Sequence, residues 1–156
     1  MKKTLIAFTT MAALTAFGVW AQDAEDPFAD AVETRHGLML QMATDLGTLG
    51  GMAKGEMAYD KAIATKAAAN VAAVASVISM VQFPAGSEYG KSPDSFALVD
   101  LWSKQDDFLA KISDLNNAAA MMQTAAATDA DAIKGSMAQL GGACSACHKA
   151  YRQPES

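Results

Sequence analysis

The sequence predicts an all-α protein folded as an antiparallel four-helix bundle. No segment shows the alternation of apolar and polar positions, rich in Val, Ile, Thr and aromatic residues, that is typical of strands. Alanine, methionine, leucine, glutamine and lysine, which favour helix, dominate instead. Four long stretches with helical periodicity are joined by short connections, which is the pattern of an antiparallel bundle.

The first two predicted helices run from Pro27 to Met52 and from Asp60 to Gln82. Six residues of the first helix recur at three- and four-residue spacing, so they are expected to share one face. They are Val32, Arg35, Met39, Met42, Leu46 and Leu49. Glycines between residues 47 and 55 are expected to weaken and then end this helix. Asp60 is the expected N-cap of the second helix, and Phe83-Pro84-Ala85-Gly86 is expected to stop it.

The third predicted helix runs from Asp94 to Ala127 and the fourth from Asp129 to Tyr151. The third is long for a globular protein, so we expect it to break near Ser103 into a short and a main helix. Thr128 with Asp131 resembles a capping box at the start of the fourth helix.

The second helix is crowded with alanines, at positions 67, 68, 69, 72, 73 and 75. Such small side chains give a thin core. The pattern by itself leaves two interpretations open, which are close packing of the helices and room for a large flat apolar ligand.

Residues 1–21 are expected to be a secretory signal peptide. Lysines at positions 2 and 3 precede an apolar run, Leu5 to Val19, that is too short to span a bilayer comfortably. Val19-Trp20-Ala21 offers a cleavage site, so residues 22–156 form the mature domain, and we expect no membrane span in it. The alternative is a leader retained as a membrane anchor.

The charge of the mature chain excludes one class of partner. Removing the leader removes two lysines and no acid, which leaves 10 basic and 17 acidic side chains and a net charge of −7. Nucleic-acid binding needs a basic face, so it is not expected. The expected partners are proteins that offer a basic patch.

One motif near the end of the chain carries chemistry, the sequence Cys144-Ser145-Ala146-Cys147-His148. This is the attachment sequence of a c-type haem. Residues at i and i+3 share a helix face, so two thiols at this spacing match one edge of the macrocycle and form two thioethers with it. The adjoining His148 then binds the iron. The sequence therefore predicts one covalently attached haem c per chain.

Two other uses of the cysteines are disfavoured. A redox dithiol usually follows a strand in a βαβ unit, whereas Cys144 and Cys147 lie late in a helix of an all-helical chain. A structural zinc site needs four ligands. The motif supplies three of them, and His36 is the one further histidine.

The chain resembles the class II c-type cytochromes from about Ala29 to Arg152. Residues 144–152, with the pair Tyr151-Arg152, look like the terminal signature of that family on the last helix of a four-helix bundle. Residues 49–56, followed by Tyr59-Asp60, are closer to the low-spin branch, cytochrome c-556, than to cytochrome c′. Leu101-Trp102 leading to Phe108 fits both branches.

The resemblance implies that Met39, four residues after Arg35, is the sixth iron ligand. Cytochrome c′ has an apolar residue there and five-coordinate iron. The residues alone support Met39 less strongly, since a methionine on an apolar helix face is usually core filler. His36, three residues before Met39, is the competitor, and a bis-histidine haem would have a lower potential. We favour His36 as a boundary residue.

Three further residues have two interpretations each. Arg35 is implied by the resemblance to pair with a haem propionate, and the alternative is a solvated arginine on a helix flank. Arg152, one turn beyond His148, covers the proximal side of the haem or interacts with the helix dipole. Trp102 packs near the haem pocket or in ordinary core.

The function that follows is outer-sphere electron transfer in the periplasm, with small and transient contacts to redox partner proteins. The alternatives are a cytochrome c′-like protein that binds nitric oxide or carbon monoxide at an open sixth site, and a peroxidase-like enzyme. The chain offers no distal acid–base set beyond His36, so we expect no enzyme. The resemblance also implies that two chains can pair as a homodimer.

Overall fold

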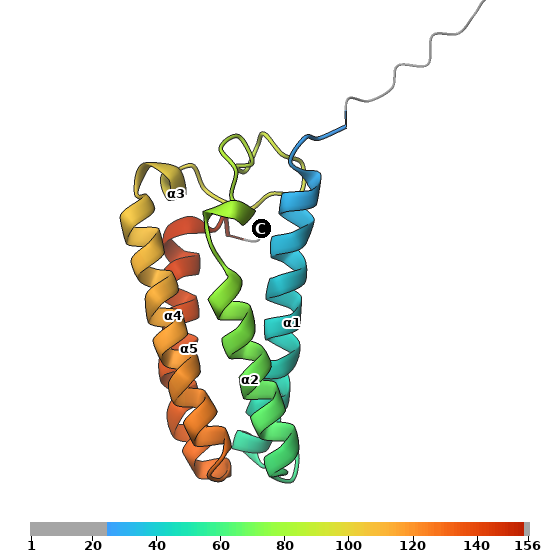
Figure 1. Cartoon of the computed structure of the whole chain (residues 1–156), viewed down its shortest axis with the longest axis vertical. Coiled ribbons are helices and arrows are strands. Elements are labelled where there is room, and N and C mark those ends of the chain that lie inside the picture. Colours follow the sequence, from blue (N-terminus) through green and yellow to red (C-terminus); the bar gives the residue numbers. More distant parts are fainter. Residues whose placement is uncertain (1–24, 155–156) are drawn as a thin grey trace, which may run out of the picture.

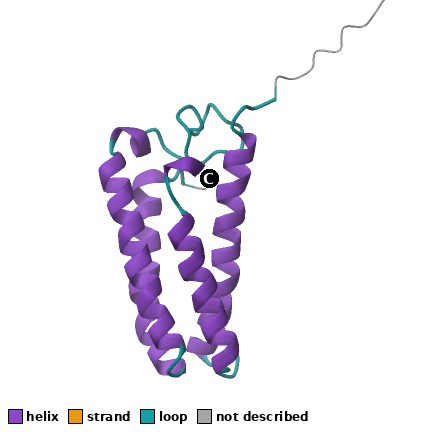
Figure 2. Cartoon of the chain, in the orientation of Figure 1, coloured by secondary structure: helices purple, strands orange, loops and turns teal. Residues whose placement is uncertain are grey.

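Four long helices stand side by side in the computed structural model, which describes residues 25–154 (Figure 1). They are α1 (Ala29–Lys54), α2 (Lys61–Val77), α4 (Gln105–Ala126) and α5 (Ala130–Tyr151). Two short helices, η1 (Met80–Gln82) and α3 (Asp100–Ser103), lie in the connection between α2 and α4. No strand is present in the described part of the chain (Figure 2), where β pairing is limited to two isolated bridges. The predicted all-α four-helix bundle is confirmed.

The N-terminal leader proposed from the sequence, residues 1–21, lies outside the described residues. Within residues 25–154, no helix combines the length and the apolarity needed to cross a bilayer.

The first helix agrees with its prediction to within two residues at each end. All six residues expected on its inner face are buried or half-buried. Gly55 ends it in the left-handed conformation, with φ of 76°, and its N–H is directed to the carbonyls of Gly51 and Met52. A non-glycine residue would be strained there, which explains why α1 stops where the glycines predicted.

The second helix begins as predicted but ends early. Asp60 is the N-cap, and its carboxylate accepts the N–H of Ile63 at 3.0 Å. The predicted end at Gln82 is wrong, because α2 stops at Val77 and a separate turn follows. Ser79 is extended and forms a capping box with Gln82, whose Oε1 accepts the Ser79 N–H at 2.8 Å. This local pairing offers the backbone an alternative to the helical ladder.

Two more predicted boundaries need correction. The predicted start at Asp94 is wrong, since the helical segment begins at Asp100. The predicted break near Ser103 is confirmed, at Lys104. Thr128 is not the cap of α5, because its hydroxyl donates to the carbonyl of Thr124 at 3.1 Å. The N-cap is Asp129, whose carboxylate accepts an N–H from the first turn at 2.8 Å.

The core is thin along most of the bundle and aromatic at one end. Alanines 64, 67, 68 and 75 of α2 are buried, so their short side chains let α2 pack closely against α1 and α4. Phe108 forms edge-to-face pairs with Phe83 and with Tyr151, at centroid distances of 5.1 and 5.5 Å. Larger side chains therefore gather at the end of the bundle where α5 ends, which Figure 1 shows beside α3.

Candidate functional site

The cysteine and histidine side chains of the motif lie in the last turns of α5. Cys144 and Cys147 are both half-buried and are not joined in a disulfide. One helical turn separates them, so they share a face, and Cys147 packs against the hydrophobic core. His148 is exposed. This arrangement presents two thiols to one side of α5 and an accessible imidazole beside them, as haem attachment requires.

The surroundings of the thiols argue against redox or zinc chemistry. Burial raises the pKa of Cys144. Burial also raises the pKa of Cys147 to about 11, with Lys111 opposing the shift. Redox pairs and zinc sites use thiolates, which electropositive sites stabilise. Both thiols instead stay protonated near neutral pH, in an apolar environment that suits the edge of a macrocycle.

The surroundings of the His148 imidazole favour its neutral form. Partial desolvation of the ring and the positive charge of Arg152 lower the pKa of His148. Neutral imidazole is the form that binds a metal. The motif residues therefore fit a covalently held haem with His148 on its iron.

Helix geometry places Met39 and His148 at about the same level of two antiparallel helices. The reference point is a contact between α1 and α5, where a Cβ added to Gly50 would lie 3.8 Å from Met137 Cε. Met39 precedes Gly50 by eleven residues, and His148 follows Met137 by eleven residues. Eleven residues are close to three whole turns, or about 16 Å. Both residues are therefore displaced from the contact by the same distance, in the same direction, on the facing sides of α1 and α5.

Arg35 is buried, with 5% of its surface exposed, so the solvated arginine considered from the sequence is wrong. Its guanidinium donates four hydrogen bonds. The acceptors are the Gln82 carbonyl at 3.1 Å, the Ser87 hydroxyl at 3.0 Å, the Ser87 carbonyl at 2.9 Å and the Ser95 hydroxyl at 2.6 Å. It also lies 5.1 Å from the ring centroid of Phe83. Burial lowers the pKa of Arg35, with Asp26 opposing the shift. The predicted propionate contact stays a prediction.

Residues 79–99, which we call the strap, join α1 to the end of α5. The strap accepts the bonds of Arg35 on one side. On the other side, Leu98 N–H donates to the Tyr151 carbonyl at 2.9 Å and Gln153 N–H donates to the Phe96 carbonyl at 2.8 Å. Nothing in the local sequence pattern indicated this bridge, because its partners are far apart along the chain.

The two remaining candidates also contact the strap. Trp102 is half-buried, and its indole N–H donates to the Phe83 carbonyl at 3.0 Å. The Arg152 guanidinium lies 5.6 Å from the ring centroid of Phe96. Their contacts with haem stay predictions.

Tyr151 has a partner that sequence reasoning missed. Its hydroxyl donates to Asp107 at 2.5 Å, which ties the last turn of α5 to the start of α4. In the sequence, the pair Tyr151-Arg152 drew attention to the tyrosine, but no pattern indicated that Asp107 would accept its hydrogen bond.

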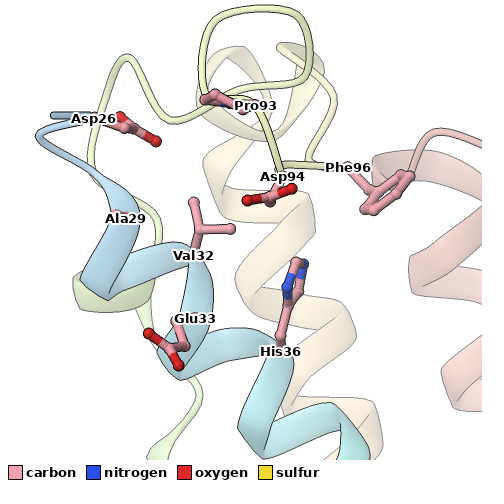
Figure 3. A pocket seen from close by; sticks show the side chains of 8 residues that line it. All are labelled: Asp26, Ala29, Val32, Glu33, His36, Pro93, Asp94 and Phe96. Carbon is pink, nitrogen blue, oxygen red and sulfur yellow. The ribbon is translucent and has the colours of Figure 1, made fainter. Parts of the chain in front are cut away.

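A cavity of about 420 Å³ lies between α1 and the strap (Figure 3). Its lining residues are Asp26, Ala29, Val32, Glu33, His36, Pro93, Asp94 and Phe96. His36 from α1 and Asp94 from the strap point into the same space (Figure 3), and the ring centroids of His36 and Phe96 are 6.2 Å apart. His36 is half-buried, which agrees with a boundary position.

Comparisons with known proteins agree with the fold and with the haem-attachment motif. Residues 30–152 match the family model described as Cytochrome C′. The chain is 51% identical over 142 residues to cytochrome c-554 of Cereibacter sphaeroides, covering 91% of this chain and 92% of that protein. It is 35% identical over 150 residues to cytochrome c-556 of Agrobacterium fabrum, covering 96% and 94%. The solved structure of cytochrome c′ from Rhodobacter sphaeroides aligns with a TM-score of 0.78 at 27% identity, covering 83% of this chain and all of that one.

Proposed function

The chain belongs to the cytochrome c′ family of class II c-type cytochromes, and from this premise we propose that it is an electron carrier whose haem iron is bound by His148 and Met39. Members of this family carry one covalently bound haem c per chain, and so does this protein. The proposal concerns the sixth ligand and the role that follows from it.

The observation that carries the proposal is the register of α1 against α5. Met39 and His148 are equally far from the contact between Gly50 and Met137, on facing sides of the two helices. A planar group attached to the thiols on α5 would therefore have the histidine on one face and the methionine on the other. His36 is one turn nearer the strap, where it lines the cavity with Phe96.

Each residue then has a definite task. The haem supplies the one-electron redox chemistry. Cys144 and Cys147 anchor it through thioethers, which prevents its loss. His148 would hold the iron from α5 as neutral imidazole, and the thioether of Met39 would raise the reduction potential by favouring the reduced state. With His148 and Met39 both bound to the iron, an external ligand would have to displace Met39.

The proposed setting is the periplasm, and the proposed partners are redox proteins. The expected leader and the cysteine-linked haem both suit an exported protein. A mature charge of −7 favours partners with a basic face, met through small and short-lived contacts.

The ferric absorption spectrum of the haem-loaded protein tests the proposal. We expect a low-spin spectrum with a methionine-to-iron charge-transfer band. Met39→Leu should lose this band and become high-spin. Met42→Leu is the matched control, because Met42 is also on the inner face of α1 but buried in the core, where the exchange conserves volume.

Two results would contradict the proposal. A high-spin spectrum of the unaltered protein would indicate an open sixth site and favour binding of nitric oxide or carbon monoxide. An unchanged low-spin spectrum of Met39→Leu would remove Met39 as the ligand. In that case His36→Ala decides whether the histidine takes its place.

A further inference from the structure

The strap holds α1 and α5 together one helical turn from each proposed axial ligand. On α1 it is held by Arg35, four residues before Met39. On α5 it is held at Tyr151, three residues after His148, and at Gln153. The strap therefore spans the two helices about one turn beyond the level of the proposed ligands.

Ser95 links Arg35 to the part of the strap that contacts the end of α5. Its hydroxyl accepts a hydrogen bond from Arg35 at 2.6 Å and from the Ala97 N–H at 3.2 Å, and it donates to the Ser87 carbonyl at 2.6 Å. Ala97 lies opposite Arg152 in an isolated antiparallel bridge, whose hydrogen bonds are made by the neighbours of Ala97: Leu98 donates to Tyr151, and Phe96 accepts from Gln153. Arg35 on α1 is thus connected through Ser95 and residues 96–98 to the end of α5.

A haem between the helices would leave little direct packing of α1 against α5 near the proposed ligands. The contact between Gly50 and Met137 holds α1 against α5 about three turns away. At the level of Met39 the two helices must leave space for the macrocycle. The distance between them is then set at that end by the strap and by the haem itself.

We propose that Arg35 and Ser95 are positioning residues that keep Met39 on the iron by fixing the spacing of α1 and α5. This inference rests on the proposed function, in which Met39 is the sixth ligand. A neutral thioether stays bound when its helix is held in place, because preorganisation raises its effective concentration at the iron. Loosening the strap lowers that concentration, and an external ligand competes more successfully.

The test is the affinity of the haem-loaded ferrous protein for carbon monoxide, measured by optical titration. We expect Ser95→Ala to raise the apparent affinity by about tenfold, because it removes a hydrogen bond from a buried charged group. Met39→Leu gives the upper limit of the effect, since no side chain then competes.

Ser92→Ala is the matched control. Ser92 is a strap serine that is as buried as Ser95, at 1% exposure, but its hydroxyl donates to Asp26 and makes no hydrogen bond with Arg35, on which Asp26 acts only through its charge. Its removal should leave the affinity within about twofold of the unaltered protein. Should Ser95→Ala fail to fold, Ser87→Ala replaces it, because this change removes another Arg35 acceptor and keeps the Ser87 carbonyl.

The outcomes separate this inference from the proposed function. Tighter binding by Met39→Leu and Ser95→Ala, with Ser92→Ala unchanged, supports the strap as a positioning device. Tighter binding by Met39→Leu alone overturns it, as does an equal effect of both serine changes. If Met39→Leu binds carbon monoxide no better than the unaltered protein, the ligand assignment fails, and the inference fails with it.

Discussion

Replacing Arg35 with methionine is expected to lower the free energy of unfolding by about 2–3 kcal/mol. The guanidinium makes four hydrogen bonds to the strap, and bonds to charged groups contribute about 1.5–3 kcal/mol each. The four bonds share one buried guanidinium, so their contributions are not additive and the loss is well below four times this value. Methionine removes the charge together with its bonds, so no charge is left buried, and the net loss lies below the roughly 3–5 kcal/mol of an interrupted buried pair.

The variant Arg35→Lys separates the contribution of the charge from that of the forked donor geometry. Lysine keeps the buried charge, but it has three donors where arginine has a planar fork, so it cannot serve all four acceptors. We therefore expect Arg35→Lys to be no more stable than Arg35→Met.

Urea unfolding followed by far-ultraviolet circular dichroism measures both variants, with the haem attached throughout. An unchanged denaturant slope shows that the variants unfold from the same native structure. Near-complete recovery of stability by lysine would refute the reasoning, because it would mean that charge alone, and not the forked geometry, accounts for the role of Arg35.

Three further predictions concern the loops, a helix cap and the pH dependence. Gly86→Ala should destabilise the protein by at least about 1 kcal/mol more than Gly90→Ala in thermal unfolding. Both glycines have positive φ, at 101° and 84°, but only at Gly86 would a Cβ meet a phenylalanine ring, at 2.8 Å. Asp129→Ala should cost about 1 kcal/mol in urea unfolding, since the α5 cap is lost, and a cost near zero would contradict the cap assignment. The hydrogen bond from Tyr151 lowers the pKa of Asp107, while burial and then that hydrogen bond raise the pKa of Tyr151 to about 12. Stability should therefore fall as the pH drops below the ordinary Asp value of 3.8 and as it rises from 10 toward 12, and Tyr151→Phe should flatten both limbs of unfolding free energy against pH.

The predicted helices succeed where the determining contacts are local. Apolar spacing within four residues, the cap at Asp60 and the glycine at position 55 account for the course of α1 and the start of α2. The boundary errors arise where a nearby side chain offers the backbone another partner. Ser79 ends the helical run by bonding with Gln82, and Asp129 rather than its neighbour caps α5.

The strap could not be predicted in the same way. Its main contacts join Arg35 to residues 47 to 60 positions further along the chain. The helical spacing placed Arg35 correctly on the inner face of α1, yet nothing in that spacing names its acceptors. Burying a cation there depends on carbonyls and hydroxyls that only the folded strap brings together.

The residues of the candidate site also fall into two groups, those predictable from local spacing and those that depend on how the helices pack. Cys144, Cys147 and His148 are adjacent in sequence, so their spacing alone indicates their chemistry. The position of Met39 across from His148 depends on how α1 packs against α5 at Gly50, which no local pattern contains. The resemblance to the class II c-type cytochromes pointed to Met39 as a ligand. The register of the two helices gives a physical reason for this assignment.

Trp102 makes the protein its own optical probe. Of the two tryptophans in the sequence, it is the one within residues 25–154. Its indole N–H is bonded to the carbonyl of Phe83, and the ring of Phe83 lies beneath the guanidinium of Arg35. Emission from this indole, quenched by energy transfer to a porphyrin, depends steeply on the separation of the two groups. Time-resolved fluorescence would therefore follow the opening of this end of the bundle in solution, without any added dye.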